Sequence, residues 1–159
     1  MKRHCPGFTL AETLVALVLL STGLLGAAGM LLGSLQSHAE ALQEMTAAQL
    51  VQDIAQRIRA NPGGRDAYDS RDAAAAAASC DLAPCAASEL AASDLAHFVA
   101  AAQSRLPGVE THAVVQFEPA IGPAAADRFA ITLSWRGPRD DDTRVVALGL
   151  LARPGAGGA

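Results

Sequence analysis

The stretch Gly7-Phe8-Thr9-Leu10-Ala11-Glu12 opens the longest uncharged run of the chain and decides its fold. Glu12 is the only ionised side chain between Arg3 and Glu40. A carboxylate at the edge of a membrane-length apolar segment is costly, and such a residue is by default functional and paired with another group. We therefore expect Glu12 to have a charged partner.

A membrane-length helix is predicted behind Glu12. The run from Thr13 to Ser37 contains about 25 residues without a charge, which is roughly 37 Å of α-helix and enough to cross the hydrocarbon core. Lys2 and Arg3 precede this run. The positive-inside rule then places the N-terminus in the cytoplasm and everything after about residue 40 across the membrane.

Two other kinds of N-terminal segment compete with this interpretation. A secretory signal peptide ends at a small-residue cleavage site, which Ser37-His38-Ala39 resembles, but the apolar run is too long for one. A generic uncleaved anchor accounts for the hydrophobicity and leaves the order of residues 7–12 unexplained.

The helix is predicted to continue beyond the membrane, from about Leu10 to Ala60, a length of roughly 75 Å. Its second half is amphipathic, because five apolar residues fall on one helical stripe: Leu42, Met45, Val51, Ile54 and Ile58. Asn61-Pro62-Gly63-Gly64 then stops the helix. We expect the amphipathic half to dock on a globular head.

The head begins poorly patterned, with a polar stretch at 65–70 and an alanine run at 73–78. Cys80 and Cys85 are natural disulfide partners in an oxidising compartment, and so short a ring contributes roughly 2 kcal/mol at best. A redox or metal site is the alternative, although the spacing is not C-x-x-C and His97 and His112 form no ligand pattern.

One further helix and three strands complete the predicted head. Helical spacing and a Pro-Gly stop place the helix from Ser88 to Leu106. Strands are expected at 112–117, 129–136 and 144–151, the second of which alternates apolar and polar residues. A polar loop at 137–142 makes the last two a hairpin. The fold class is therefore α+β, a long helix packed on a second helix and an antiparallel sheet of about three or four strands, with a flexible tail from Pro154.

Composition argues against several functions. The net charge is −4 and Lys2 is the only lysine, so nucleic acid is an unlikely partner. The sequence has no Gly-rich phosphate loop, no H-E-x-x-H and no nucleophile motif, and neither catalysis nor a cofactor is expected. Asp140 to Asp142 reads as a solvated hairpin tip; cation binding is the alternative, but three consecutive acids lack the alternating spacing of a calcium loop.

The apolar helix contains four glycines: Gly23, Gly26, Gly29 and Gly33. Small residues allow helices to approach closely, and Gly29 and Gly33 fit the small-xxx-small pattern. Each glycine also lowers helix propensity by roughly 1 kcal/mol. Packing against neighbouring helices, local unwinding and simple tolerance of glycine all remain open.

The N-terminus resembles the class III signal of type IV prepilins and of type II secretion pseudopilins. A short basic leader ends in Gly7, followed by Phe8-Thr9-Leu10, Glu12 and an unbroken apolar helix; Ala11 departs from the larger aliphatic residue usual there. The resemblance implies cleavage after Gly7 by a prepilin peptidase and N-methylation of Phe8. The amine of Phe8 then provides the expected partner of Glu12, either within one helix or, as the family suggests, between subunits.

The head resembles the PilV group of minor pilins in its paired cysteines, in Leu106-Pro107-Gly108 and in a strand ending at Trp135-Arg136, and departs from it at Phe98. The expected parts are a leader (1–7), a membrane and fibre-core half-helix (8–37), an amphipathic half-helix (38–60), a periplasmic head (61–153) and a tail (154–159). The expected function is a minor pilin at the inner membrane, whose partners are other major and minor pilins and the assembly platform. A type II secretion pseudopilin and a membrane-anchored binding module are the alternatives.

Overall fold

The computed structural model describes residues 9–71, 80, 84–106, 108, 110–121, 126–137 and 143–152. Several predicted features lie outside these residues: the leader with Gly7, the new terminus at Phe8, the alanine run at 73–78, the acidic triplet at 140–142 and the tail from 154.

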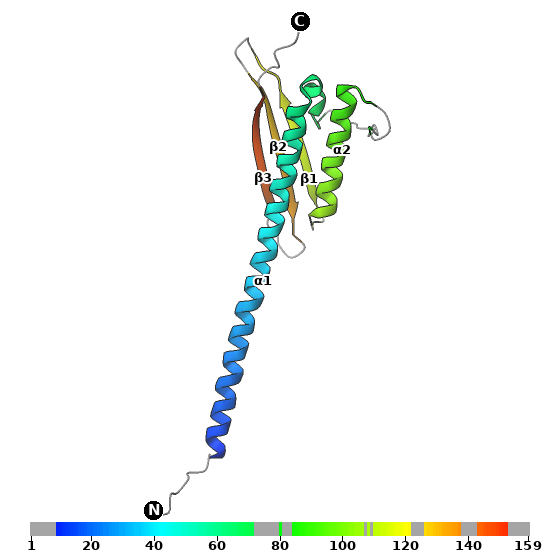
Figure 1. Ribbon diagram of the computed structural model, residues 1–159. Coiled ribbons are helices and arrows are strands. Elements are labelled where there is room, and N and C mark those ends of the chain that lie inside the picture. The colour runs from blue at the N-terminus through cyan, green and yellow to red at the C-terminus, as the bar shows by residue number, and fades with distance from the viewer. Residues whose placement is uncertain are drawn as a thin grey trace, which may run out of the picture. The chain divides into compact units, whose positions relative to one another are not determined.

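The order of elements confirms the predicted fold class. Two helices and a short 3-10 helix precede three strands: α1 (Leu10–Ala60), η1 (Pro62–Tyr68), α2 (Ala87–Arg105), β1 (Thr111–Glu118), β2 (Asp127–Arg136) and β3 (Thr143–Ala152). The strands form one antiparallel sheet in the order β1-β2-β3 (Figure 1). The chain divides into two compact units at Ala41, and we describe each by itself.

The amphipathic part of α1 buries a stripe that only partly matches the predicted one. Val51, Ile54 and Ile58 are buried as expected. Leu42 and Met45 are 53% and 60% exposed, so the prediction was wrong for these two. The buried stripe instead runs through Ala47 and Leu50. Its helical continuation toward the N-terminus reaches Gln43 and Thr46, which puts Leu42 and Met45 on the exposed face.

The central strand β2 supplies the largest part of the core. Phe129, Ile131, Leu133 and Trp135 are all completely buried, which confirms the predicted alternation. On both sides β2 pairs antiparallel without a break in register, and its pairing with β3 confirms the hairpin. In Figure 1, α2 and the later turns of α1 lie on the same face of this sheet. The core therefore forms between two helices and one sheet face.

The turn after α1 depends on a glycine at Gly64. The α-helix ends at Ala60, as the Asn61-Pro62 stop predicted, and the chain continues into η1 instead of a loop. A Cβ added to Gly64 would overlap the carbonyl oxygen of Ala87 and lie 2.7 Å from the Asn61 amide nitrogen. Glycine is thus required here because the backbone of α2 approaches too closely for a side chain.

Replacing Gly64 by alanine should therefore destabilise the head. We expect Gly64→Ala to cost about 1–3 kcal/mol, because the start of α2 must move to make room for the methyl group. Gly63→Ala is the matched control, since a Cβ there meets the Cβ of Ala87 at an ordinary 3.4 Å. Thermal unfolding of the two purified variants, followed by Trp135 fluorescence, measures the difference. Equal midpoints for both variants would contradict the close approach.

The three residues that follow η1 close the outer edge of β1 at Val115 and Phe117. Ser70 N–H donates to the carbonyl of Val115 at 2.9 Å, and the Val115 N–H donates back to Ser70 Oγ at 2.9 Å. Further along, the Phe117 N–H donates to the Asp69 carboxylate at 3.3 Å, and Arg71 Nη2 donates to the Phe117 carbonyl at 3.1 Å. Side chains and a turn therefore satisfy the edge that a strand would otherwise occupy.

This edge closure should be sensitive to acid. The hydrogen bond from Arg71 lowers the pKa of Asp69 to about 2, below the ordinary value of about 3.9. A depressed pKa stabilises the fold above about pH 4, and this contribution is lost as the pH falls from about 4 toward 2. Asp69→Asn should therefore be less stable at pH 7 and show a shallower loss of stability below pH 4. Urea midpoints measured across this range test the prediction; a wild-type acid slope in the variant would contradict it.

Candidate functional site: the N-terminal helix and the junction of α1, η1 and α2

Thr9 caps the start of α1 and positions Glu12. The Glu12 N–H donates to the Thr9 carbonyl at 3.1 Å and lies 3.4 Å from Thr9 Oγ1. Thr9 is thus the N-cap and Glu12 the third residue of the helix, where a carboxylate favours the positive end of the helix dipole. The sequence analysis missed this role of Thr9, although the pattern Thr-x-x-Glu before an apolar run is the signature of a capping box.

The Glu12 side chain is exposed in the first turn of α1. Within the described part of the chain it forms no ion pair. The amine expected to pair with it belongs to Phe8, which lies outside the described residues. The single chain therefore presents the carboxylate at the end of the helix and leaves its pairing open.

Side-chain hydroxyls in the apolar half of α1 donate to carbonyl oxygens of the same helix. Ser21 Oγ donates to the Leu17 carbonyl at 2.6 Å, and Thr22 Oγ1 donates to the Val18 carbonyl at 3.0 Å. Hydroxyls bonded inside the helix need no water, which suits a hydrocarbon environment. Among the described residues, α1 is the one helix long and apolar enough to span a membrane by length and composition.

The four glycines of this half-helix pack against nothing else among the described residues. A Cβ added to Gly23, Gly26, Gly29 or Gly33 would meet no atom within 4 Å. Each position would therefore accept a side chain in the isolated chain. If the glycines are needed for packing, the atoms that approach them belong to other molecules.

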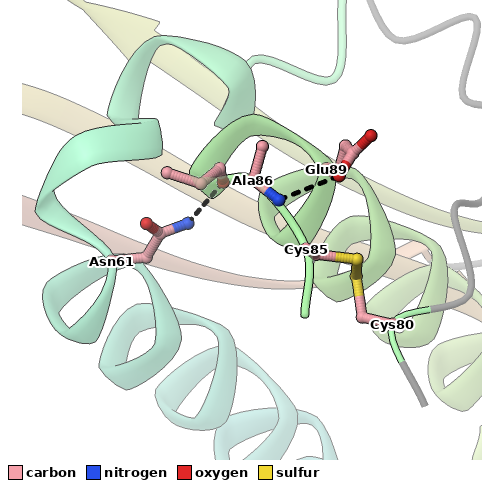
Figure 2. Close-up of a disulfide and its surroundings, with 6 residues drawn as sticks. Asn61, Cys80, Cys85, Ala86 and Glu89 are labelled. Atoms are coloured by element: carbon pink, nitrogen blue, oxygen red, sulfur yellow. Dashed lines mark hydrogen bonds between the residues drawn. A yellow bond between two sulfur atoms is a disulfide. The ribbon is translucent and has the colours of Figure 1, made fainter. Parts of the chain in front are cut away.

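Cys80 and Cys85 form the predicted disulfide, with the sulfurs 2.07 Å apart, directly before α2 (Figure 2). Beside it the Ala86 N–H donates to Glu89 Oε2 at 2.8 Å, and Asn61 Nδ2 donates to the Ala87 carbonyl at 2.7 Å. The disulfide, the cap and the side chain of Asn61 thus converge on the first turn of α2 and tie it to the end of α1.

A buried carboxylate, Asp94, joins α2 to η1 and α1. It is 5% exposed, accepts from the Tyr68 hydroxyl at 2.6 Å and accepts from Arg57 Nη1 at 2.9 Å. Burial raises the pKa of Tyr68, and the hydrogen bond to Asp94 raises it further, so the hydroxyl remains a donor at neutral pH. The sequence analysis missed this network, because Tyr68 stands in a polar stretch; its being the only tyrosine was the one available signal.

The hydrogen bonds of Asp94, Tyr68 and Arg57 hold the fold together and are not arranged to bind a ligand. Both Asp94 oxygens already have donors, and Arg57 also pairs with Asp53 at 2.9 Å. Each oxygen of the Asp94 carboxylate thus accepts a hydrogen bond from inside the fold, and the charge is paired with that of Arg57. In the parts of the chain that the structure describes, no three His, Cys, Asp or Glu residues lie where they could hold a metal ion.

Two comparisons with protein families match the chain, over adjoining ranges. The model described as Tt1218-like, Type IV pilin Tt1218, matches residues 29–100, and the model of the prokaryotic N-terminal methylation motif matches residues 2–28. Searches of curated proteins and of solved structures found no match. The chain is thus similar to a type IV pilin over residues 29–100 and to the prepilin-like methylation motif over residues 2–28, and its apolar N-terminal helix suggests membrane anchoring.

Loss of the Tyr68 hydroxyl should weaken the junction of α1, η1 and α2. Tyr68→Phe leaves Asp94 buried with one donor fewer, so we expect a cost of about 1–3 kcal/mol. Ser104→Ala is the control, because that hydroxyl is exposed and bonds only the carbonyl of Ala101 in its own helix. Urea denaturation at pH 7 gives both values. A Tyr68→Phe variant no less stable than the control would show that the buried hydroxyl contributes nothing.

Proposed function

We propose that this protein is a minor pilin, a subunit that a prepilin peptidase cleaves after Gly7 and that takes part in initiating, assembling or modifying the type IV pilus. The observation that carries the proposal is the overlap of the methylation motif at residues 2–28 with the exposed apolar start of α1. A chain built this way acts by assembly and needs no catalytic group. Its paired cysteines and the strand end at Trp135-Arg136 favour the PilV group.

Glu12 is the assembly charge in this proposal. Cleavage after Gly7 creates a cationic amine at Phe8, which is then N-methylated. A carboxylate leaving water is stabilised chiefly by an opposite charge nearby. Because Glu12 stands exposed in the first turn of α1, it is free to meet the amine of a neighbouring subunit and to set the axial register of the fibre.

The glycines of the apolar half-helix fit the same role. Since a Cβ at any of the four positions would be open to solvent in the single chain, helices of other subunits have room to approach their backbones. The competing role, local unwinding inside the fibre, uses the same low helix propensity.

The proposed topology is a single membrane pass with a cytoplasmic N-terminus and a periplasmic head. Lys2 and Arg3 support this orientation. The disulfide between Cys80 and Cys85 supports it as well, since disulfides persist in oxidising compartments such as the periplasm.

The mature N-terminus tests the proposal directly. Mass spectrometry of the protein purified from its native host should find a chain that begins with N-methyl-Phe8. A chain beginning at Glu40 would identify a secretory signal peptide, and an intact Met1 an uncleaved anchor; either result would overturn the proposal. Loss of surface pili on deletion, with protein secretion unchanged, would separate the pilus from the type II secretion alternative.

Removing the assembly charge should impair the fibre and spare processing. We expect Glu12→Ala to be cleaved normally and to enter the sheared pilus fraction roughly tenfold less, which corresponds to about 1.4 kcal/mol of lost interaction. Thr13→Ala is the matched control, because Thr13 is also exposed but uncharged, and its hydroxyl donates to the Leu10 carbonyl of its own helix. Quantitative blots of precursor, mature chain and fibre measure both steps. Normal incorporation of Glu12→Ala would remove this role from the carboxylate.

A further inference from the structure

The two edges of the sheet differ. On β1, the backbone groups of Val115 and Phe117 point away from β2 and bond to residues 69–71. Because antiparallel neighbours alternate between bonded and non-bonded pairs, this fixes the direction of every backbone group in the sheet. On β2, Ile131 and Leu133 must bond toward β3, and their partners there are Leu148 and Val146.

The remaining residues of β3 therefore aim their backbone groups at the outer edge. These residues are Val145, Ala147, Gly149 and Leu151, which together present four N–H and four C=O groups. Within the described residues, no hydrogen bond reaches these groups from outside the sheet. Among the described residues, the edge of β3 is thus open along its length, whereas the edge of β1 is bonded at Val115 and Phe117.

Nothing in residues 145–152 discourages another strand from pairing there. The segment Val145-Val146-Ala147-Leu148-Gly149-Leu150-Leu151-Ala152 has no charge and no proline, and its register with β2 has no bulge. Charges, prolines and bulges are the features by which proteins normally protect an edge strand from pairing. On the face away from α1, Val145 and Leu151 are 58% and 68% exposed, so an added strand would also cover apolar surface.

A shallow groove lies beside β3, and its lining residues indicate which side chains an added strand would carry. It has a volume of about 270 Å³ and lies between Leu148 of β3 and one flank of α1. That flank contributes Gln52, Ala55, Gln56 and Arg59. Arg59 has no ion pair among the described residues. A strand that carries an acidic or amide side chain toward α1 would match the two amides and the cation.

None of the three described strands offers such a side chain. The β1 edge is bonded to residues 69–71 at Val115 and Phe117, and β3 has no acidic residue between Thr143 and Ala152. The acids of the other two strands, Glu118 and Asp127, already pair with Arg128 and Arg65. The three described strands therefore favour a different protein as the source of the complementary strand.

We propose that the free edge of β3 receives an extended strand of a second, different pilin-like subunit, which becomes the fourth strand of the sheet. The identity of the partner class rests on the proposed function, since a minor pilin acts among other subunits. Main-chain hydrogen bonds to residues 145–151 supply the affinity, and the groove beside Arg59 supplies the selectivity.

Photo-crosslinking of the full chain in its native host tests this. Benzoyl-phenylalanine at Val145 should yield an adduct with another pilin-like protein, identified by mass spectrometry, and the same probe at the exposed Gln116 of β1 should yield none. Adding Ala147→Lys should lower the adduct yield at least fivefold, because a charge on an edge strand opposes pairing. Gln116→Lys is its matched control, with the same charge on the same face two strands away. Trp135 fluorescence checks that each variant folds.

Three results would overturn the proposal: no adduct at Val145 in cells that process the chain and incorporate it into fibres, equal adducts at Val145 and Gln116, or an adduct of twice the mass of this chain, which would indicate a second copy. The same cells report separately on the proposed function. If the chain is neither cleaved after Gly7 nor found in the fibre, that function fails, whatever the crosslinks show.

Discussion

The head depends on burying one stripe of α1. Val51, Ile54 and Ile58 lie in one core with residues of α2 and of the inner face of the sheet, and they need both to exclude water. Burial of apolar area is the main favourable term in folding, and a head of this size has little of it to spare. The polar contacts between α1, η1 and α2 matter because they fix where α1 and α2 meet. The stripe of α1 can be buried only if the two helices are held in that position.

Three groups of contacts hold α1, η1 and α2 together where α1 ends and α2 begins. Asp94 is buried with donors from Tyr68 and Arg57, so one carboxylate links α2, η1 and α1. Gly64 lets the backbone of α2 come close, and Asn61 satisfies the carbonyl of Ala87 where they meet. A half-satisfied network of this kind would cost more than an apolar one. The interaction is specific because each partner comes from a different element.

Several surfaces remain incomplete in the single chain, and they share a physical character. Glu12 ends the apolar helix without an ion pair among the described residues, and the helix glycines have open space where a side chain would be. The outward backbone groups of β3 have no partner among the described residues, whereas β1 is bonded at Val115 and Phe117. The proposed function would have other subunits complete these charges, backbones and strand edges.

The sequence by itself determined the elements. The apolar run, the Asn61-Pro62 stop and the alternation around Ile131 depend on neighbours along the chain, and the predicted helix limits and strands agree with the structure to within two residues. Only the tertiary structure decided which side chains are buried and which edge is open. Leu42 and Met45 fit the helical period yet lie exposed, Tyr68 stands in a polar stretch yet is buried, and Asp69 closes one edge from 48 residues away. Periodicity is a local property, but burial depends on which distant element lies opposite, and no local pattern specifies that.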